Sequence, residues 1–231
     1  MGQTIERYQY RGQLKTGYLS EQVNSVLQLS IERIKALIKQ EKIMTAALYY
    51  YGDMLFLYYE TIKEGIKEKE PSIKPEELVG ELSPYLEMWP GVEGKRLWVH
   101  MPTVYYHAIP ESVEDWSRPM IPELRRGRIA FLYEESLFEY VYHHVAIVNE
   151  GLLQGDKYQF IGLHENILFS YFEEPKMMMN IQRDLSRASE AIQGWLDVNP
   201  ETHFISKGDG GVGNFMFLPS YFALGQEEKM K

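Results

Sequence analysis

The stretch MLFLYYE at residues 54–60 returns as ILFSYFE at residues 167–173, 113 positions later in the 231-residue chain. Each copy follows a helix-like segment and precedes a second one with a late tryptophan, Trp89 in the first and Trp195 in the second. A repeat of this length is typical of a duplicated small domain, because solenoids repeat every 20 to 50 residues or so. The sequence therefore predicts two related units.

Both copies show the same predicted order of elements, strand–helix–strand–strand–helix–strand, from apolar spacing and turn residues. In the first copy the expected elements are a strand at 7–15, a helix at 20–38, strands at 42–48 and 54–61, a helix at 75–89 and a strand at 97–108. In the second copy they are a strand at 128–133, a helix at 135–153, strands at 157–163 and 166–173, a helix at 176–198 and a strand at 214–218.

This order is that of the ferredoxin-like arrangement. Right-handed crossovers place both helices on one face of an antiparallel sheet, and the other, apolar face then needs a partner. We predict the α+β class: two tandem ferredoxin-like β-α-β-β-α-β repeats at 1–108 and 128–224, joined by a linker at 109–127. Their antiparallel sheets are expected to pack as an intramolecular α/β barrel.

Composition excludes several kinds of partner. The net charge of −9 argues against a nucleic-acid surface, which requires clustered Lys and Arg. The sequence has no apolar run of about 18 residues that would suggest a membrane span or a leader. The absence of cysteine excludes disulfides and thiolate ligands. We expect a cytoplasmic protein without nucleic-acid or membrane partners; assembly into a homodimer stays open.

The candidate chemistry lies on the helix at 135–153. Tyr140 and His144 are four residues apart and therefore share a helix face. Histidine exchanges a proton near neutral pH, and a neighbouring tyrosine can hold or protonate an oxygen. His143 projects about 100° away from His144, and zinc needs three or four converging ligands, so no metal site is expected. The plain alternative is a half-buried Tyr/His pair without function.

Residues 128–220 resemble the L-rhamnose mutarotase family. Its members carry a Tyr, three residues and a His on this helix, followed by Ile-Trp-Pro-Glu; Tyr140, His144, Ile147 and Glu150 match this pattern. The resemblance implies a cofactor-independent epimerase that interconverts the anomers of a monosaccharide, for example a deoxyhexose. His144 would be the acid/base and Tyr140 would position or protonate the opposite sugar oxygen, with no metal or organic cofactor.

The chain departs from the family in the second helix of this copy. Ala191 and Ile192 stand where the family has a Trp pair, and Trp195 follows about one turn later. Tyr133, Tyr171 and Trp195 are the residues that we expect to contribute to substrate binding.

Two other functions stay open. The protein could be a non-catalytic small-molecule-binding or structural barrel. It could also be a monooxygenase-type enzyme of the same barrel class, acting on aromatic or haem substrates; a His facing an apolar cavity large enough for a planar ring would indicate this function. The basic residues Arg125, Arg126 and Arg128 could bind an anion, although such clusters are more often a solvated patch.

Overall fold

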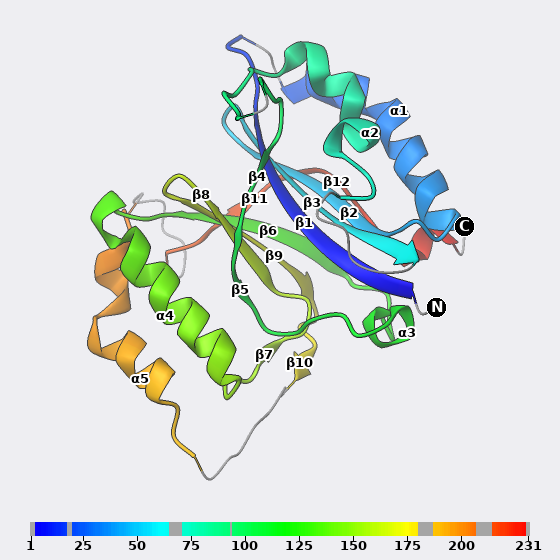
Figure 1. Ribbon diagram of the computed structural model, residues 1–231. Helices are drawn as coiled ribbons and strands as arrows, with labels where there is room; N and C mark the ends of the chain where they lie inside the picture. Colours follow the sequence, from blue (N-terminus) through cyan, green and yellow to red (C-terminus); the bar gives the residue numbers. More distant parts are fainter. Residues whose placement is uncertain are drawn as a thin grey trace. The chain divides into compact units, whose positions relative to one another are not determined.

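The computed structural model describes residues 3–17, 20–64, 71–92, 94–179, 187–206 and 214–229. The chain is α+β, and its described strands form two five-stranded antiparallel sheets and a short two-stranded one (Figure 1). It divides into two units, the first made of Met1–Met101, Pro110–Ile121 and Pro219–Lys231, the second of Pro102–Ile109 and Pro122–Leu218. No helix in these described ranges is both long and apolar enough to cross a membrane.

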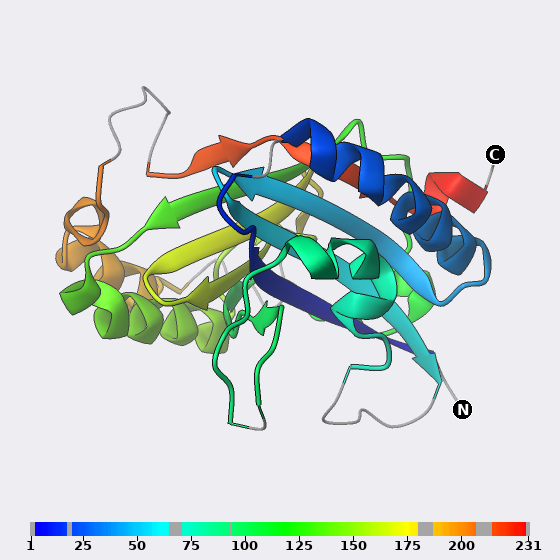
Figure 2. The same cartoon turned by 90° about the horizontal axis from the view of Figure 1, so that it is seen from above.

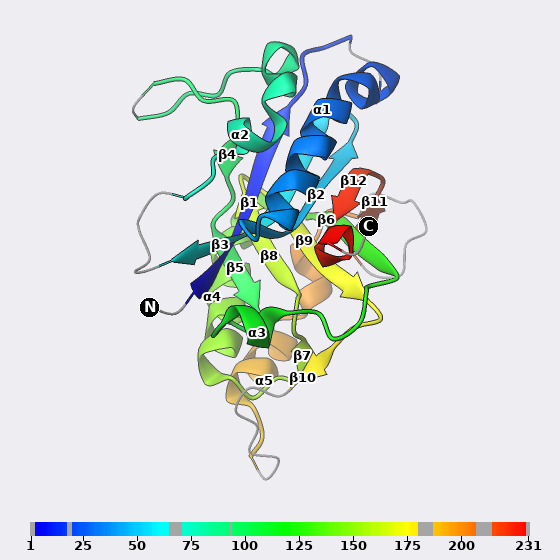
Figure 3. The ribbon, with the colours of Figure 1, turned by 90° about the vertical axis from the view of Figure 1, so that its right-hand side faces the viewer.

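The first unit has the sheet order β12-β2-β3-β1-β4. Its elements are β1 (Gln3–Gln13), α1 (Ser20–Lys39), β2 (Ile43–Tyr51), β3 (Met54–Glu64), α2 (Pro75–Val79), the 3-10 helix η1 (Gly80–Tyr85), β4 (Val99–His100), α3 (Val113–Trp116), β12 (Ser220–Leu224) and η4 (Gln226–Lys229). Helices α1 and α2 lie on one face of this sheet (Figure 3). Apolar residues at helical spacing from Val23 to Ile38 place one side of α1 in the core.

The second unit has the sheet order β11-β6-β9-β8-β5. Its elements are β5 (Thr103–Tyr106), β6 (Leu124–Phe131), η2 (Glu134–Ser136), α4 (Leu137–Glu150), β7 (Gly155–Asp156), β8 (Phe160–His164), β9 (Ile167–Glu174), β10 (Met178–Met179), α5 (Glu190–Asp197), η3 (Pro200–His203) and β11 (Met216–Leu218). Helices α4 and α5 lie side by side against one face of this sheet (Figure 2).

Each five-stranded sheet contains a strand from the other half of the sequence. Strand β5 pairs with β8, and β12 pairs with β2. The boundaries of the two units therefore differ from the predicted ranges. Residues 102–109 belong to the second unit, and residues 110–121 and 219–231 belong to the first. The physical reason is that an open sheet edge is completed by whichever strand can reach its unpaired backbone groups.

Two predicted helices are shorter in the structure. The helix expected at 75–89 is α-helical only to Val79 and continues as a 3-10 helix containing Pro84, which has no N–H to donate. The helix expected at 176–198 is α5, which begins at Glu190, while Met178–Met179 pairs with β7 as β10. Residues 180–186 of this prediction lie outside the described residues.

The repeated Tyr-x-Glu at the end of the duplicated strand has the same structure in both units. The Tyr58 hydroxyl donates to Glu60 Oε1 at 2.6 Å, and the Tyr171 hydroxyl donates to Glu173 Oε1 at 2.7 Å. All four residues are buried, with at most 2% of Glu173 exposed. The repeat thus preserves a buried, hydrogen-bonded carboxylate in each sheet.

Candidate functional site

A cavity of about 430 Å³ lies in the second unit, lined from α4, α5 and the sheet face that these helices cover. A volume of this size is in the range of small-molecule sites, about 300 to 1,000 Å³. Its aromatic lining consists of Tyr105, Tyr140, Trp195, Phe204 and Phe215. Its polar lining consists of Arg128, His144, Gln159, Glu201 and Asn214.

Tyr140 and His144 both line this cavity from one face of α4, as their spacing predicts. Their rings are stacked, with centroids 3.8 Å apart and an interplanar angle of 21°. The His144 Nδ1 lies 2.9 Å from the Tyr140 carbonyl oxygen. Because a carbonyl oxygen only accepts, Nδ1 carries the proton and donates, which leaves Nε2 of the neutral ring with a free lone pair. Within the described residues, Nε2 has no hydrogen-bond partner.

Burial keeps both groups neutral at physiological pH. Desolvation lowers the pKa of His144 to about 4, opposed by the Tyr140 carbonyl and supported by the neighbouring His143 and His203. Burial also raises the pKa of Tyr140, so its hydroxyl keeps its proton. The arrangement is a neutral imidazole that can accept a proton beside a phenol that can donate a hydrogen bond.

Trp195 forms an aromatic wall against this pair from α5. Its ring meets His144 edge-on with centroids 4.9 Å apart, and Tyr140 edge-on at 5.7 Å. Two hydrogen bonds hold the start of α5. Ser189 caps the helix by accepting from the Ile192 N–H at 3.0 Å. Glu150, from the end of α4, accepts from the Glu190 N–H at 3.0 Å. Glu150 thus connects the start of α5 to the end of α4, and this connection places Trp195 of α5 at the cavity.

The structure places Tyr133 and Tyr171 outside the cavity lining. Tyr133 is 43% exposed and precedes η2, where its N–H donates to the His203 carbonyl at 2.9 Å. Tyr171 lies on β9 next to Ser170, and since successive side chains of a strand point to opposite faces, it points away from the face on which Ser170 meets Arg128. Of the five predicted site residues, the cavity brings together Tyr140, His144 and Trp195.

Tyr105 was missed because its strand belongs to the first half of the sequence. It pairs with Ile161 of β8, and its ring meets His144 edge-on at 5.9 Å. Burial, with Asp156 nearby, raises the pKa of Tyr105 to about 12. No local motif at residue 105 indicates this position, because the pairing of β5 with β8 is a long-range contact.

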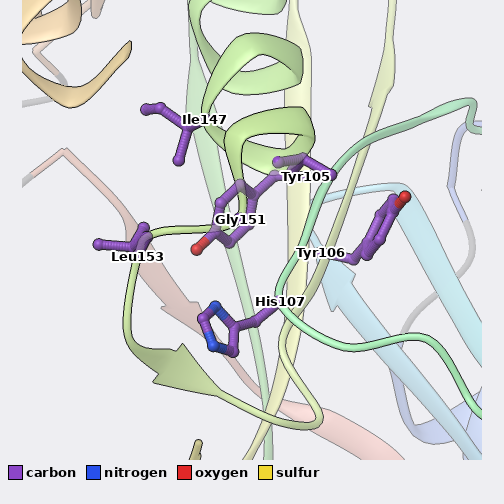
Figure 4. Close-up of a pocket in the computed structure, with 7 residues that line it drawn as sticks. Tyr105, Tyr106, His107, Ile147, Gly151 and Leu153 are labelled. Carbon is purple, nitrogen blue, oxygen red and sulfur yellow. The ribbon is translucent and has the colours of Figure 1, made fainter. Parts of the chain in front are cut away.

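A second, smaller cavity of about 30 Å³ lies beneath the end of α4. Figure 4 shows Tyr105 and His107 on the same side of β5 and Tyr106 on the other. The His107 Nε2 lies 2.6 Å from the Met179 carbonyl oxygen and 3.0 Å from the Gly155 nitrogen, and burial lowers the pKa of His107. This volume holds about one water molecule, so we interpret His107 as a structural residue.

Nothing in the described residues groups three or more His, Asp or Glu side chains in a way that could hold a metal ion. The ring of His143 is tilted against that of Trp195, with centroids 5.6 Å apart, and His143 does not line the cavity.

Comparisons with known proteins give weak structural likeness. No protein-family model and no curated protein matches the chain. It is similar to a candidate monooxygenase from Lactobacillus acidophilus NCFM, with a TM-score of 0.42, 8% identity and 96% and 97% of the two chains covered. A candidate monooxygenase from Fusobacterium nucleatum matches with a TM-score of 0.39 and 9% identity over 96% and 95%. An anthrone oxidase-like protein matches with a TM-score of 0.34 and 10% identity over 98% and 94%.

These comparisons correct the predicted activity. The similar structures are described as monooxygenases or as anthrone oxidase-like, which corresponds to the last of the three functions considered from the sequence and contradicts a sugar mutarotase. At these low identities and TM-scores the likeness says nothing of the chemistry of this chain, which has to come from the site itself. There, Ile192 lines the cavity where the mutarotase family has a tryptophan.

Proposed function

We propose that the cavity of the second unit binds a planar aromatic compound with a weakly acidic C–H group, and that His144 removes that proton in a cofactor-independent oxygenation. The observation that carries this proposal is the neutral His144, whose Nδ1 is bound to the Tyr140 carbonyl and whose ring lines an aromatic cavity. Flat rings suit walls made by aromatic side chains, which prefer stacked and edge-on contacts.

The proton transfer is supported by the environment of His144. An imidazole with a lowered pKa is a weak base, but it is neutral and can accept a proton. When it takes the proton, the substrate becomes an anion beside the new imidazolium, and this opposite charge raises the histidine pKa. The Tyr140 hydroxyl, which burial keeps protonated, is the candidate donor to the substrate oxygen on which the negative charge collects.

Dioxygen is the co-reactant that completes the reaction. The substrate carbanion supplies electrons to O₂ and forms a C–O bond, giving a peroxide. The O–O bond then breaks: one oxygen stays as a new carbonyl and the other leaves as water with the two hydrogens of the original CH₂ group. One CH₂ compound and one O₂ thus give one ketone and one water.

The test uses anthrone, a tricyclic ketone with an acidic CH₂ group, as the probe. We expect the full chain to exchange this CH₂ for deuterium and to consume O₂ faster than buffer. The His144→Asn variant should lose both activities by 100-fold or more, roughly the share of a general base. His143→Asn is the matched control, because His143 adjoins His144 on α4 but does not line the cavity.

Other outcomes would redirect the proposal. Anthrone binding without exchange or O₂ uptake would support the non-catalytic binding protein instead. A visible haem spectrum in the purified protein would indicate that the ligand of the cavity is a bound haem and not a free aromatic substrate.

We also propose that each unit is a ferredoxin-like repeat. The strand orders β4-β1-β3-β2 and β11-β6-β9-β8 within the two sheets support this. Packing of the two sheets as an intramolecular barrel, the cytoplasmic location and a homodimer stay predictions.

A further inference from the structure

Three arginines of β6 differ in their partners. The Arg125 Nε lies 3.8 Å from Glu173 Oε1, and the Arg126 Nε donates to Glu174 Oε2 at 3.1 Å. Arg128 makes no ion pair with any described carboxylate. Asp156 acts on it electrostatically, but without a hydrogen bond. Of this basic cluster, Arg128 is the one that lines the cavity.

The guanidinium of Arg128 is held in place by neutral groups. Its Nε donates to Ser170 Oγ at 3.3 Å. Its carbon lies 4.5 Å from the centroid of the Phe215 ring and 5.0 Å from that of Phe172. These contacts orient the guanidinium and leave its two terminal nitrogens without a hydrogen-bond partner in the described part of the chain.

A partly buried cation without a hydrogen-bonded counter-ion is costly, because burial removes water that the protein has not replaced. The cost is visible in the pKa of Arg128, which burial lowers despite the opposing effects of Tyr140 and Asp156. An anionic group on a ligand would remove this cost.

We infer that Arg128 binds a carboxylate carried by the planar aromatic ligand of the cavity, an inference that rests on the proposed function only for the aromatic nature of that ligand. The planar guanidinium presents two parallel N–H groups, which match the two oxygens of a carboxylate. Arg128 is the one Lys or Arg among the described lining residues, and a single cation suits one such negative charge better than a phosphate dianion. The substrate class is therefore an aromatic carboxylic acid.

The test compares two probes of the same shape, 2-naphthoate and its neutral amide 2-naphthamide, by isothermal titration calorimetry on the full chain. We expect naphthoate to bind at least about 10-fold more tightly, the effect of a charge-assisted hydrogen-bonded pair. Arg128→Gln should abolish this preference, and Arg128→Lys should retain part of it. Arg126→Gln is the matched control, since Arg126 lies two residues away on β6, pairs with Glu174 and does not line the cavity.

Equal binding of the two probes by the parent protein, or binding of neither, would overturn the inference. So would an unchanged preference in a folded Arg128→Gln protein, with folding checked by near-UV circular dichroism. If that variant does not fold, the parent's preference and the Arg128→Lys variant decide. Because calorimetry needs no turnover, a naphthoate preference without anthrone exchange would keep the anion site and remove the oxygenase proposal.

Discussion

The ring of His144 lies on the ring of Tyr140, and its Nδ1 is 2.9 Å from the carbonyl oxygen of the same residue. One residue therefore sets both the plane and the tautomer of the imidazole. The i, i+4 spacing on α4 makes this possible, because such residues are stacked one turn apart. The pair is a preorganised unit, and its neutrality has consequences for stability as well as for chemistry.

The first prediction concerns the pH dependence of stability. The pKa of His144 is about 4 in the folded protein and near 6.5 in an unfolded chain. The unfolded state therefore binds the proton first as pH falls. The contribution of neutral His144 is complete above pH 6.5 or so and is lost as pH falls toward 4, on the order of 3 kcal/mol in total.

Urea unfolding at several pH values should reveal this contribution in the difference between the parent protein and His144→Asn. We expect the parent to lose more stability than the variant from pH 7 to 4.5. Parallel curves would show that His144 is not desolvated in the folded protein.

The second prediction separates the ring of Tyr140 from its hydroxyl. Tyr140→Phe keeps the ring contacts and removes a hydroxyl that has no hydrogen-bond partner among the described residues, so stability should change by less than about 1 kcal/mol. Tyr140→Ala should cost about 3–5 kcal/mol, because the ring is 1% exposed. If the hydroxyl assists the reaction, Tyr140→Phe should also slow anthrone exchange by roughly 10-fold or more. A large loss of stability in Tyr140→Phe would contradict the conclusion that the hydroxyl has no hydrogen-bond partner.

The third prediction concerns the buried carboxylate of the first unit. Arg118 donates to both oxygens of Glu60, at 2.7 and 2.9 Å, and both side chains are at most 4% exposed. Removing Arg118 takes away the bidentate partner of a buried carboxylate, so Arg118→Met should cost about 3–5 kcal/mol. The double variant Glu60→Gln/Arg118→Met should cost less than the sum of the two single changes.

Chemical denaturation followed by circular dichroism measures these differences. The exposed pair Glu32–Lys35 on α1, 3.0 Å apart, is the control, and Lys35→Met should cost less than about 1 kcal/mol. Equal costs at the two pairs would mean that burial of Glu60 does not govern its energetics.

The fourth prediction tests the close packing of Gly155 on His107. A Cβ at residue 155 would lie 2.7 Å from the His107 Nδ1, closer than real side chains approach. Gly155→Ala should therefore lower the melting temperature and cost about 1–3 kcal/mol through overpacking. Gly80→Ala is the control, because an added Cβ there meets nothing within 4 Å; destabilisation of the same size in both variants would exclude overpacking as the cause.

Local patterns predicted the class of the fold and part of the site. The duplicated strand ending in Tyr-x-Glu, and the apolar spacing of α1 and α4, depend on residues that are close in sequence. The helical face shared by Tyr140 and His144 is of the same kind. Trp195 was expected at the site as well, although its contact with His144 depends on the capping of α5 by Ser189 and Glu150.

The alternation of side chains along a strand is a local property. Which face of the sheet the helices cover is not a local property. Tyr133 and Tyr171 were expected at the cavity and lie elsewhere, because their place depends on which face of the sheet the helices cover and on where β6 ends. In the same way, the sequence could not distinguish Arg128 from Arg125 and Arg126. The difference arises from their partners, Glu173 and Glu174 for two of them and aromatic rings for the third.

The sequence by itself determined the repeated strand motif, the α+β class and the shared helix face of Tyr140 and His144, since these follow from periodicity and spacing within short segments. Only the tertiary structure decided that β5 joins the sheet of the second unit, that Tyr105 and Arg128 reach the cavity, and that the cavity is aromatic. The physical reason is that sheet edges, cavities and charge partners are created by contacts between segments far apart in the chain, and a local pattern specifies which face a residue occupies but not what will cover it.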